Sequence, residues 1–417
     1  MTKKKTTDNT KDTATKHHHY KQLLIIGIPI IIGQLGTIVL GFADTLMIGH
    51  HSTRELAAAG LVNNIFGLVL LFYLGFSYGL TPVVGKLFGM ERHTEIGEKV
   101  KNSLVANMLI GVMLVSIMTV LYFNLSRIGQ PEELLGLIRP YFLVNLVSVL
   151  FVGVFNTLKQ LFDGIGRTKV AMWTMIGGNC LNILFNWLLI YGVGGFPELG
   201  LLGAGLSTMG ARIVMAVALV VVLVSRKEFR PYLTSLFTGK VNRADFNEMN
   251  RLGWPVAMQL GMETAAFSLS CVMVGWLGTL PLAAHQVTIT ISQLFYLTIF
   301  GMASAMSIRI SHFAGQNDND GILANSRDGF RLVLMCSLLL SLPILAFRNH
   351  IGALFTSSVE VQQTVATLII VLVVYQFGDG MQYTFANALR GIACVRPLVP
   401  CAFIAYFVIS LPLGYAL

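Results

Sequence analysis

Long apolar segments alternate with short polar ones along the whole chain. A helix needs roughly 20 mostly apolar residues to cross the hydrocarbon core of a bilayer. Eleven segments meet this need, with soft edges, at residues 22–48, 56–84, 102–123, 134–161, 168–191, 201–225, 252–277, 282–308, 330–347, 360–389 and 397–417. Strands are disfavoured because lipid-exposed sheet edges leave backbone groups unsatisfied and the alternating pattern of a membrane barrel is missing. The pattern therefore predicts an all-α polytopic membrane protein.

The second half of the chain repeats the first. Gly27 and Pro29 reappear as Gly253 and Pro255, an offset of 226 residues (253 minus 27). Further pairs at this offset are Met47-Ile48-Gly49 with Met273-Val274-Gly275, Leu56-Ala57-Ala58 with Leu282-Ala283-Ala284, Gly75 with Gly301, and Gly89 with Gly315. Two related helical bundles in one membrane chain are typical of a secondary transporter, with its site between or inside the halves.

The repeat also predicts how the chain divides. The first unit closes with the span at 201–225, whose counterpart would fall at 427–451, after the last residue Leu417. We therefore expect two pseudo-symmetric six-helix lobes, of which the second lacks its last helix. The expected parts are a disordered cytoplasmic tail (1–19), an N-terminal lobe (20–225), a basic cytoplasmic linker (226–250) and a truncated C-terminal lobe (251–417).

Composition and charge agree with a membrane location. Hydrophobic residues make up 54% of the chain and charged residues 12%, whereas a soluble domain carries about 25% charged residues. If the N-terminus is cytoplasmic, the outer side carries only Arg54, Arg127, Arg139 and Arg348, and most other basic residues lie inside. This asymmetry follows the positive-inside rule. We therefore attribute the net charge of +9 to the orientation of the protein in the membrane rather than to nucleic-acid binding. We expect a multi-pass protein of the cytoplasmic (inner) membrane.

Three acidic residues lie inside the predicted spans, where an ionisable group is costly and marks a candidate functional site. Asp44 lies toward the outer end of the first span, Glu263 in the middle of the seventh and Asp379 inside the tenth. Tyr375 lies four residues before Asp379 and so on the same helical face. The fifth span adds a polar stripe at spacings of three and four, made of Asn179, Asn182 and Asn186.

Carboxylate, amide and phenol oxygens suit a hard cation such as Na⁺. A buried carboxylate can instead carry a proton. We therefore predict that Glu263 and Asp379 couple transport to Na⁺ or H⁺, as candidate Na⁺ ligands, rather than only making structural hydrogen bonds. Asp44 is predicted to take part in ion coupling on the same grounds and also to belong to a substrate or proton site with Asn182 and Asn186, although these two asparagines also suit interhelical hydrogen bonds. No cofactor is expected beyond the coupling ion.

Other polar residues inside the spans are interpreted as structural. Arg212 and Arg309 are expected to pair with backbone groups or helix ends, and Lys159 to extend toward the cytoplasm. The five cysteines show neither zinc-type spacing nor an extracellular disulfide pattern, so we interpret them as packing residues.

The ordered set of motifs resembles the multidrug and toxic compound extrusion (MATE) family, and most closely its NorM-type branch. The resemblance covers about residues 20–417. The motifs that carry it are Gly27-Ile28-Pro29 with Gln34, Asp44-Thr45-Leu46-Met47-Ile48-Gly49, Leu56-Ala57-Ala58, Pro255 with Gln259 and Glu263, Leu282-Ala283-Ala284-His285-Gln286, and Leu389-Arg390-Gly391.

The resemblance implies twelve helices in two lobes around a central cavity, and export of amphipathic organic cations in exchange for Na⁺ or H⁺ by alternating access. The family's second-lobe cation site maps onto Glu263, Tyr375 and Asp379. Its first-lobe acidic site maps onto Asp44, with Asn182 and Asn186 beside it. We expect a monomer that contacts membrane lipid and no nucleic acid.

Two other functions are weighed against this one. Gly75-Phe76-Ser77-Tyr78-Gly79 fits the G-x-S-x-G motif of a serine hydrolase, but that motif needs a strand-to-helix elbow and here it lies near the end of an apolar helix. A lipid-linked precursor flippase of the same superfamily would need a strongly cationic cavity for pyrophosphate. The candidate cavity residues are acidic or neutral apart from Arg212, so the antiporter is favoured and no enzymatic activity is predicted.

Overall fold

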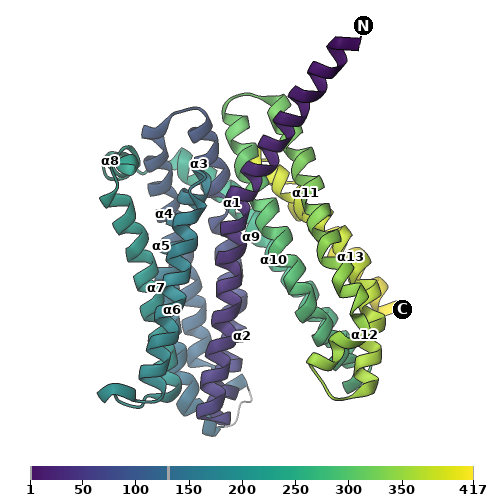
Figure 1. Cartoon of the computed structure of the whole chain (residues 1–417). Helices are drawn as coiled ribbons and strands as arrows, with labels where there is room; N and C mark the ends of the chain where they lie inside the picture. The colour runs from purple at the N-terminus through teal and green to yellow at the C-terminus, as the bar shows by residue number, and fades with distance from the viewer. Residues whose placement is uncertain (1, 129–131, 417) are drawn as a thin grey trace. The chain divides into compact units, whose positions relative to one another are not determined.

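The structure is a computed structural model that describes the backbone of residues 2–128 and 132–416, and side chains from residues 19–127 and 133–416. Within these residues every regular element is helical and there is no strand (Figure 1). Eleven helical segments are long and apolar enough to cross a membrane. The prediction of an all-α protein with eleven spans is therefore confirmed.

The observed spans match the predicted ones, with helices that often extend past the apolar core. In chain order the α-helices are α1 (Thr2–His51), α2 (Thr53–Ser77), α3 (Leu80–Gly89), α4 (His93–Phe123), α5 (Glu132–Gly164), α6 (Thr168–Ile190), α7 (Gly200–Ser225), α8 (Arg230–Thr238), α9 (Arg243–Gly275), α10 (Thr279–Gly315), α11 (Asn319–Ala346), α12 (Arg348–Ile351), α13 (Val359–Gly391), α14 (Leu398–Phe403) and α15 (Leu411–Ala416). Short 3₁₀ segments are η1 (Leu125–Ile128), η2 (Val193–Gly195), η3 (Lys227–Phe229) and η4 (Gly352–Leu354), and η5 (Ile404–Ser410) is a π-helix. Helices α2 and α3 form one span, and α14, η5 and α15 form the last.

The N-terminal segment differs from its prediction. Helix α1 begins at Thr2, so the residues expected to form a disordered tail continue the first span as helix. The sequence has neither glycine nor proline before Gly27. Because these are the residues that most often end a helix, nothing in the local sequence stops it.

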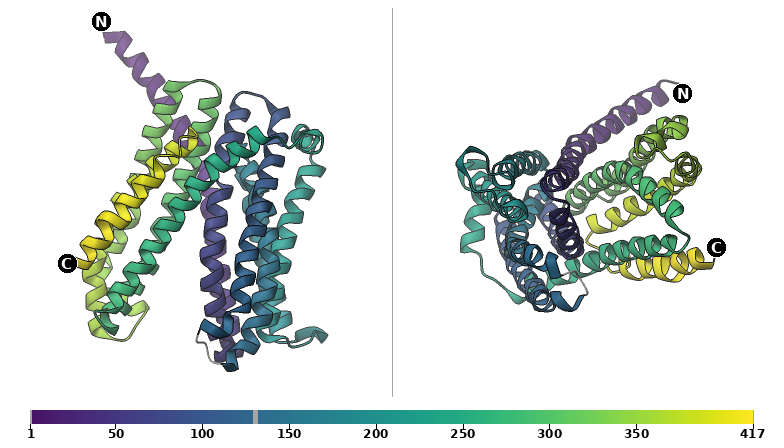
Figure 2. Two further views of the ribbon diagram at one scale, coloured as in Figure 1. Left: turned by 180° about the vertical axis from the view of Figure 1, so that it is seen from behind. Right: turned by 90° about the horizontal axis from the view of Figure 1, so that it is seen from below.

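The chain folds into two compact units that are not contiguous halves. Unit 1 contains Met1–Ile31 and Met262–Leu417, and unit 2 contains Ile32–Gly261. Within each unit the long helices lie beside one another, as Figure 2 shows. The expected lobes differ from this division at α1 and α9. The first part of α1 belongs to unit 1 and the rest to unit 2, and the first part of α9 belongs to unit 2 and the rest to unit 1. Pro29 and Pro255 lie within these helices, where proline removes one backbone hydrogen bond.

Glycines shared by the two repeats allow close helix contacts. In unit 2, a Cβ added to Gly75 of α2 would lie 2.8 Å from the Ala257 Cα of α9, and one added to Gly253 would lie 2.7 Å from the Phe76 backbone oxygen. In unit 1, α1 approaches α10 in the same way, with a Cβ at Gly27 3.0 Å from the sulfur of Met302. The first helix of each repeat therefore packs on the second helix of the other repeat.

The expected linker is helical and docked on α4 within unit 2. Lys99 of α4 lies 2.6 Å from carboxylate oxygens of both Asp245 and Glu248. A Cβ at Gly97 would collide with the backbone oxygen of Tyr232 in α8, so glycine permits this contact. The Tyr232 side chain is buried, and burial raises the pKa of its phenol. These contacts attach the start of α9 to α4, so the linker is more than a flexible connector.

Candidate functional site

The acidic residues of the seventh and tenth spans lie in unit 1, on α9 and α13. Tyr383 of α13 donates a hydrogen bond to Oε1 of Glu263 at 2.6 Å. Among the described residues, the other oxygen of Glu263, Oε2, is buried and has no hydrogen-bond partner. Tyr296 of α10 stacks edge-on against Tyr383, with ring centroids 5.4 Å apart. The site therefore holds Glu263 through Oε1 and leaves Oε2 without a donor among the described residues.

Asp379 lies one helical turn from both tyrosines of α13. The hydroxyl of Tyr375 lies 3.3 Å from Oδ1 of Asp379, to which it donates. Tyr406, in the π-helical segment η5, is close enough to Glu263 and Asp379 to interact with both electrostatically. Its hydroxyl accepts a hydrogen bond from Gln382 at 2.7 Å. Two carboxylates and three phenol oxygens thus belong to one cluster.

This cluster is chemically suited to a monovalent cation or a proton. Carboxylate and hydroxyl oxygens are the ligands that hard cations prefer. A buried carboxylate oxygen without a hydrogen bond is unfavourable, so the open Oε2 of Glu263 favours a bound cation or proton. Among the described residues there is no group of three or more His, Cys, Asp and Glu side chains that could hold a metal ion.

A second acidic group lies in unit 2, where α1 faces α6. The amide nitrogen of Asn186 donates to Oδ1 of Asp44 at 2.5 Å and to Oδ1 of Asn182 at 2.9 Å. With its amide turned, Asn182 donates to the same Asp44 oxygen at 2.9 Å and accepts from Thr208 of α7 at 3.2 Å. Both asparagines are fully buried. The structure therefore brings together the three residues that the resemblance placed in one site.

Asp44 opens onto a cavity of about 580 Å³ inside unit 2. Its wall is mostly apolar, with amide and hydroxyl groups and three charged residues, Asp44, Lys159 and Arg212. Such a wall, apolar with few polar groups, is typical of a small-molecule site. On the wall, Tyr141 donates to Oδ1 of Asn63 at 3.0 Å.

The expectations for Arg212 and Arg309 were wrong. Lys159 is buried and lies 2.5 Å from Asp163 one turn away, so an i,i+4 carboxylate pairs with its charge. Arg212 bonds the hydroxyl of Ser148 rather than backbone. In unit 1, Arg309 donates to Asn325 Oδ1 at 3.0 Å and lies over the ring of Phe313.

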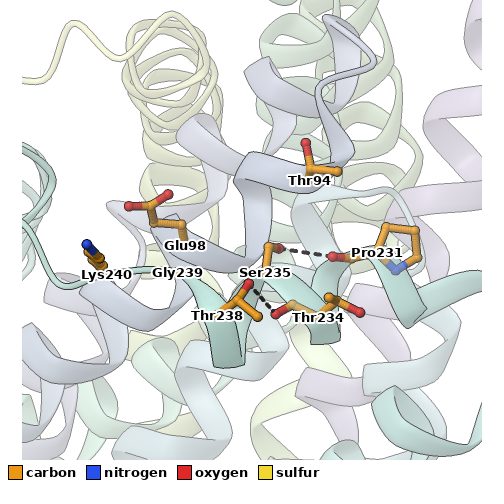
Figure 3. Close-up of a pocket in the computed structure, with 8 residues that line it drawn as sticks. All are labelled: Thr94, Glu98, Pro231, Thr234, Ser235, Thr238, Gly239 and Lys240. Carbon is orange, nitrogen blue, oxygen red and sulfur yellow. Dashed lines mark hydrogen bonds between the residues drawn. The ribbon is translucent and has the colours of Figure 1, made fainter.

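A second hollow, of about 630 Å³, lies at the surface between α4 and α8 (Figure 3). Glu98 and Lys240 lie on its wall with four hydroxyl side chains. Two of these hydroxyls are bonded to backbone oxygens within α8, as in Ser235 to Pro231 at 3.0 Å. The hollow is wide open and belongs to the docking of α8 on α4.

The segment that fits a hydrolase motif does not have the required geometry. Ser77 is the last residue of α2 and follows a helix rather than a strand. Its hydroxyl donates to Asn107 Oδ1 at 2.7 Å and to the Tyr73 backbone oxygen at 3.1 Å. Ser77 therefore contributes to packing between α2 and α4, and the nucleophile elbow of that motif is not present here.

Sequence reasoning missed Tyr383 and Tyr406. Tyr375, Asp379 and Tyr383 follow one another at intervals of four, so the helical face that connected the first two also contained the third. Tyr406 gave no comparable signal, because its approach to the acids depends on how the last span packs. The Lys159–Asp163 pair was missed as well, although its spacing of four residues would have indicated it.

A helical membrane protein with partly unpaired carboxylates inside its spans has the features of a transporter. The model of the family described as MatE matches residues 29–188 and 255–416. The chain belongs to the MatE family of transporters.

Similar proteins include the multidrug resistance protein NorM of Photobacterium profundum, which is 30% identical over 409 residues, covering 96% of this chain and 89% of the relative. The protein of the same name in Vibrio parahaemolyticus is 30% identical over 407 residues, with coverage of 96% and 89%. A solved MATE transporter of Vibrio cholerae superposes with a TM-score of 0.85 at 19% identity, over 96% of this chain and 90% of that chain. At this identity the likeness concerns the fold.

A solved MOP superfamily transporter of Pyrococcus furiosus gives a TM-score of 0.84 at 19% identity, over 95% of this chain and 88% of that chain. Its description reports a reversed polarity of the binding pocket and a different function. The same fold therefore accommodates pockets of different charge, and the cargo has to be argued from the residues of this chain.

Proposed function

We propose that this protein is a cation-coupled multidrug efflux antiporter that exports amphipathic organic cations by alternating access. Na⁺ or H⁺ is the coupling ion and binds at Glu263 and Asp379. Tyr375 and Tyr383 hold these carboxylates, and Asp44 with Asn182 and Asn186 forms the cargo or proton site. The relatives named multidrug resistance protein support this function.

The observation that carries the proposal is the state of Glu263. One of its oxygens accepts from Tyr383 at 2.6 Å, and the other is buried without a donor among the described residues. A carboxylate with a purely structural role would accept hydrogen bonds at both oxygens, because an unsatisfied buried acceptor is destabilising. A group that alternately binds and releases a cation or proton needs a free oxygen.

The proposed location is the cytoplasmic membrane, with the N-terminus inside. The positive-inside distribution of Lys and Arg supports this orientation. In that orientation the docked linker lies on the cytoplasmic side. We further propose that the protein works as a monomer in the lipid bilayer.

Efflux from vesicles tests this function. Proteoliposomes loaded with a fluorescent organic cation are given a Na⁺ gradient or a pH gradient separately. We expect one of the two gradients to drive export against the dye's concentration gradient. The coupling ion shifts the equilibrium between the inward-open and outward-open states only if it binds them with different affinities. Export that responds to neither gradient contradicts the proposal.

A lipid-linked precursor flippase is the other candidate, since Arg212 and Lys159 contribute positive charge to the cavity of unit 2. Lys159 is already paired with Asp163, which leaves little positive charge for a pyrophosphate. Binding of an anionic lipid-linked precursor with no response to organic cations is the outcome that favours the flippase.

A further inference from the structure

Helix α8 (Arg230–Thr238) lies outside the membrane spans and across them. The candidate spans found in the described part of the chain leave it out, since one ends at Ser225 and the next begins at Arg243. In Figure 1 it is seen nearly end-on at the edge of unit 2, whereas α5, α6 and α7 run along the picture, and the rear view in Figure 2 agrees. A helix that crosses the spans at one end of the bundle lies along the membrane surface.

The two ends of α8 lie at different depths along α4. Near the start of α8, the backbone of Tyr232 lies against Gly97 of α4. At its other end, Lys101 of α4 donates to the backbone oxygens of Phe237 at 3.3 Å and Gly239 at 2.8 Å. Lys101 follows Gly97 by four residues, which is about 6 Å along the helix. The C-terminal end of α8 is therefore the end closer to the apolar middle of α4.

This deeper end carries exposed apolar side chains. Phe237 is 71% exposed and Val241, just after α8, is 49% exposed. The apolar segment of α4 begins at residue 102, so Phe237 lies at the level where lipid begins. An aromatic and an aliphatic side chain at this level are typical of a helix that lies in the membrane interface. Lipid is therefore the occupant that the depth of this surface favours.

Basic residues flank the apolar pair. Residues 226–243 contain five exposed basic residues, Arg226, Lys227, Arg230, Lys240 and Arg243. The single acidic residue of this segment is Glu228, which gives a net charge of +4 (5 minus 1). Glu228 lies 2.9 Å from Arg167 and 3.6 Å from Arg226. Four or more basic residues beside an amphipathic helix suit anionic lipid headgroups.

We propose that α8 and the basic residues around it form a docking surface for the headgroups of anionic phospholipids. Phe237 and Val241 enter the boundary between headgroups and acyl chains, and the basic side chains contact the lipid phosphates. In the proposed orientation these lipids belong to the cytoplasmic leaflet. The lipid contacts stabilise the docking of the linker on α4. This inference concerns the linker and does not depend on which ion or cargo the protein carries.

Hydrogen exchange of the full-length protein in lipid nanodiscs tests the proposal. Mass spectrometry compares the α8 peptide in nanodiscs of phosphatidylcholine alone with nanodiscs that also contain phosphatidylglycerol, which is anionic. We expect exchange of the α8 amides to be about five to ten times slower with phosphatidylglycerol. Exchange follows local opening, and each basic residue near an anionic surface contributes about a fivefold change in an equilibrium constant.

Paired variants locate the effect on this surface. In the double variant Arg230→Gln, Lys240→Gln we expect most of the slowing by phosphatidylglycerol to be lost, with exchange in phosphatidylcholine unchanged. Phe237→Ser exchanges faster in both lipids, because it removes the apolar contact. The control Arg127→Gln, Arg139→Gln removes two exposed arginines at the other end of unit 2, so the net charge changes equally and the slowing is retained.

The salt dependence of the unmodified protein is a second measurement that needs no variant. Raising NaCl to about 1 M shortens the Debye length to about 3 Å, so we expect the slowing by phosphatidylglycerol to disappear. Glycerol phosphate, added to the protein in detergent, is expected to leave exchange unchanged.

Four results would overturn the proposal. Equal exchange in the two kinds of nanodisc shows that anionic lipid does not act on α8. Slowing that persists at high salt excludes the charge attraction. Loss of the effect in the Arg127 and Arg139 control assigns it to net charge rather than to this surface. Slowing by glycerol phosphate alone indicates a site for free phosphate instead of a membrane contact.

Discussion

At the scale of single residues, the second-half site consists of carboxylates held by phenols. Tyr383 bonds Glu263 at 2.6 Å, and Tyr375 lies 3.3 Å from Asp379. The Tyr383–Glu263 bond is the stronger of the two, because a charge-assisted O–H···O⁻ bond is stronger at a shorter distance. Glu263 is therefore the more firmly oriented of the two acids, and Asp379 has more freedom to turn toward a bound ion.

Replacing Tyr383 with phenylalanine tests the role of the shorter bond. The variant Tyr383→Phe keeps the ring in contact with Tyr296 and removes only the donor. We expect the coupling-ion concentration for half-maximal efflux to change by about tenfold to a hundredfold, since a hydrogen bond to a charged group contributes about 1.5–3 kcal/mol. The exposed Tyr415 provides the control Tyr415→Phe, with no expected change. An unaltered ion dependence in Tyr383→Phe speaks against the phenol as a holder of the site.

At the scale of helices, each unit contains close contacts between elements of different repeats. In unit 2, Gly75 of α2 meets the backbone of α9, and in unit 1, Gly27 of α1 meets α10. The sequence showed that Gly75 corresponds to Gly301 and Gly27 to Gly253, but spacing could not show that each glycine lies against a helix of the other repeat. Small residues at such contacts let membrane helices approach closely, where packing rather than the hydrophobic effect holds them together.

The variant Gly75→Ala tests this contact. Its Cβ would lie 2.8 Å from the Ala257 Cα, which is backbone and cannot turn aside. We expect destabilisation of about 1–3 kcal/mol from overpacking, seen as a lower melting temperature of the purified protein. Gly60 on the same helix has open space at its Cβ position, so Gly60→Ala is the matched control and melts at or above the unmodified temperature. Equal melting of both variants contradicts the close contact.

The docked linker gives a second test at this scale. Lys99→Met leaves Asp245 and Glu248 without the cation that lies 2.6 Å from each. We expect faster trypsin cleavage after Lys240 in the linker, because cleavage follows local opening. Lys86→Met removes an exposed lysine as the control and leaves the cleavage rate unchanged. A rate in Lys99→Met equal to that of the control indicates that the linker docks without this ion pair.

At the scale of the whole molecule, the sequence predicted what depends on local composition. The eleven spans followed from hydropathy, and Asp44, Glu263 and Asp379 stood out because charge is rare inside a span. The division of α1 and α9 between two units, and the approach of Tyr406 to the acids, depend on packing between distant segments. Arg212 was interpreted as structural, and its position on the wall of the cavity of unit 2 likewise depends on packing.

Efflux by the variant Asp379→Asn, in vesicles with an imposed Na⁺ or pH gradient, tests the central claim most directly. Asparagine keeps the size of the side chain and can still accept from Tyr375, so we expect a folded protein with normal melting. It cannot carry the negative charge that binds a cation or exchanges a proton. The account predicts that gradient-driven efflux of a fluorescent organic cation is abolished under both gradients. Efflux by this variant at the unmodified rate under either gradient would contradict the assignment of Asp379 as a coupling group.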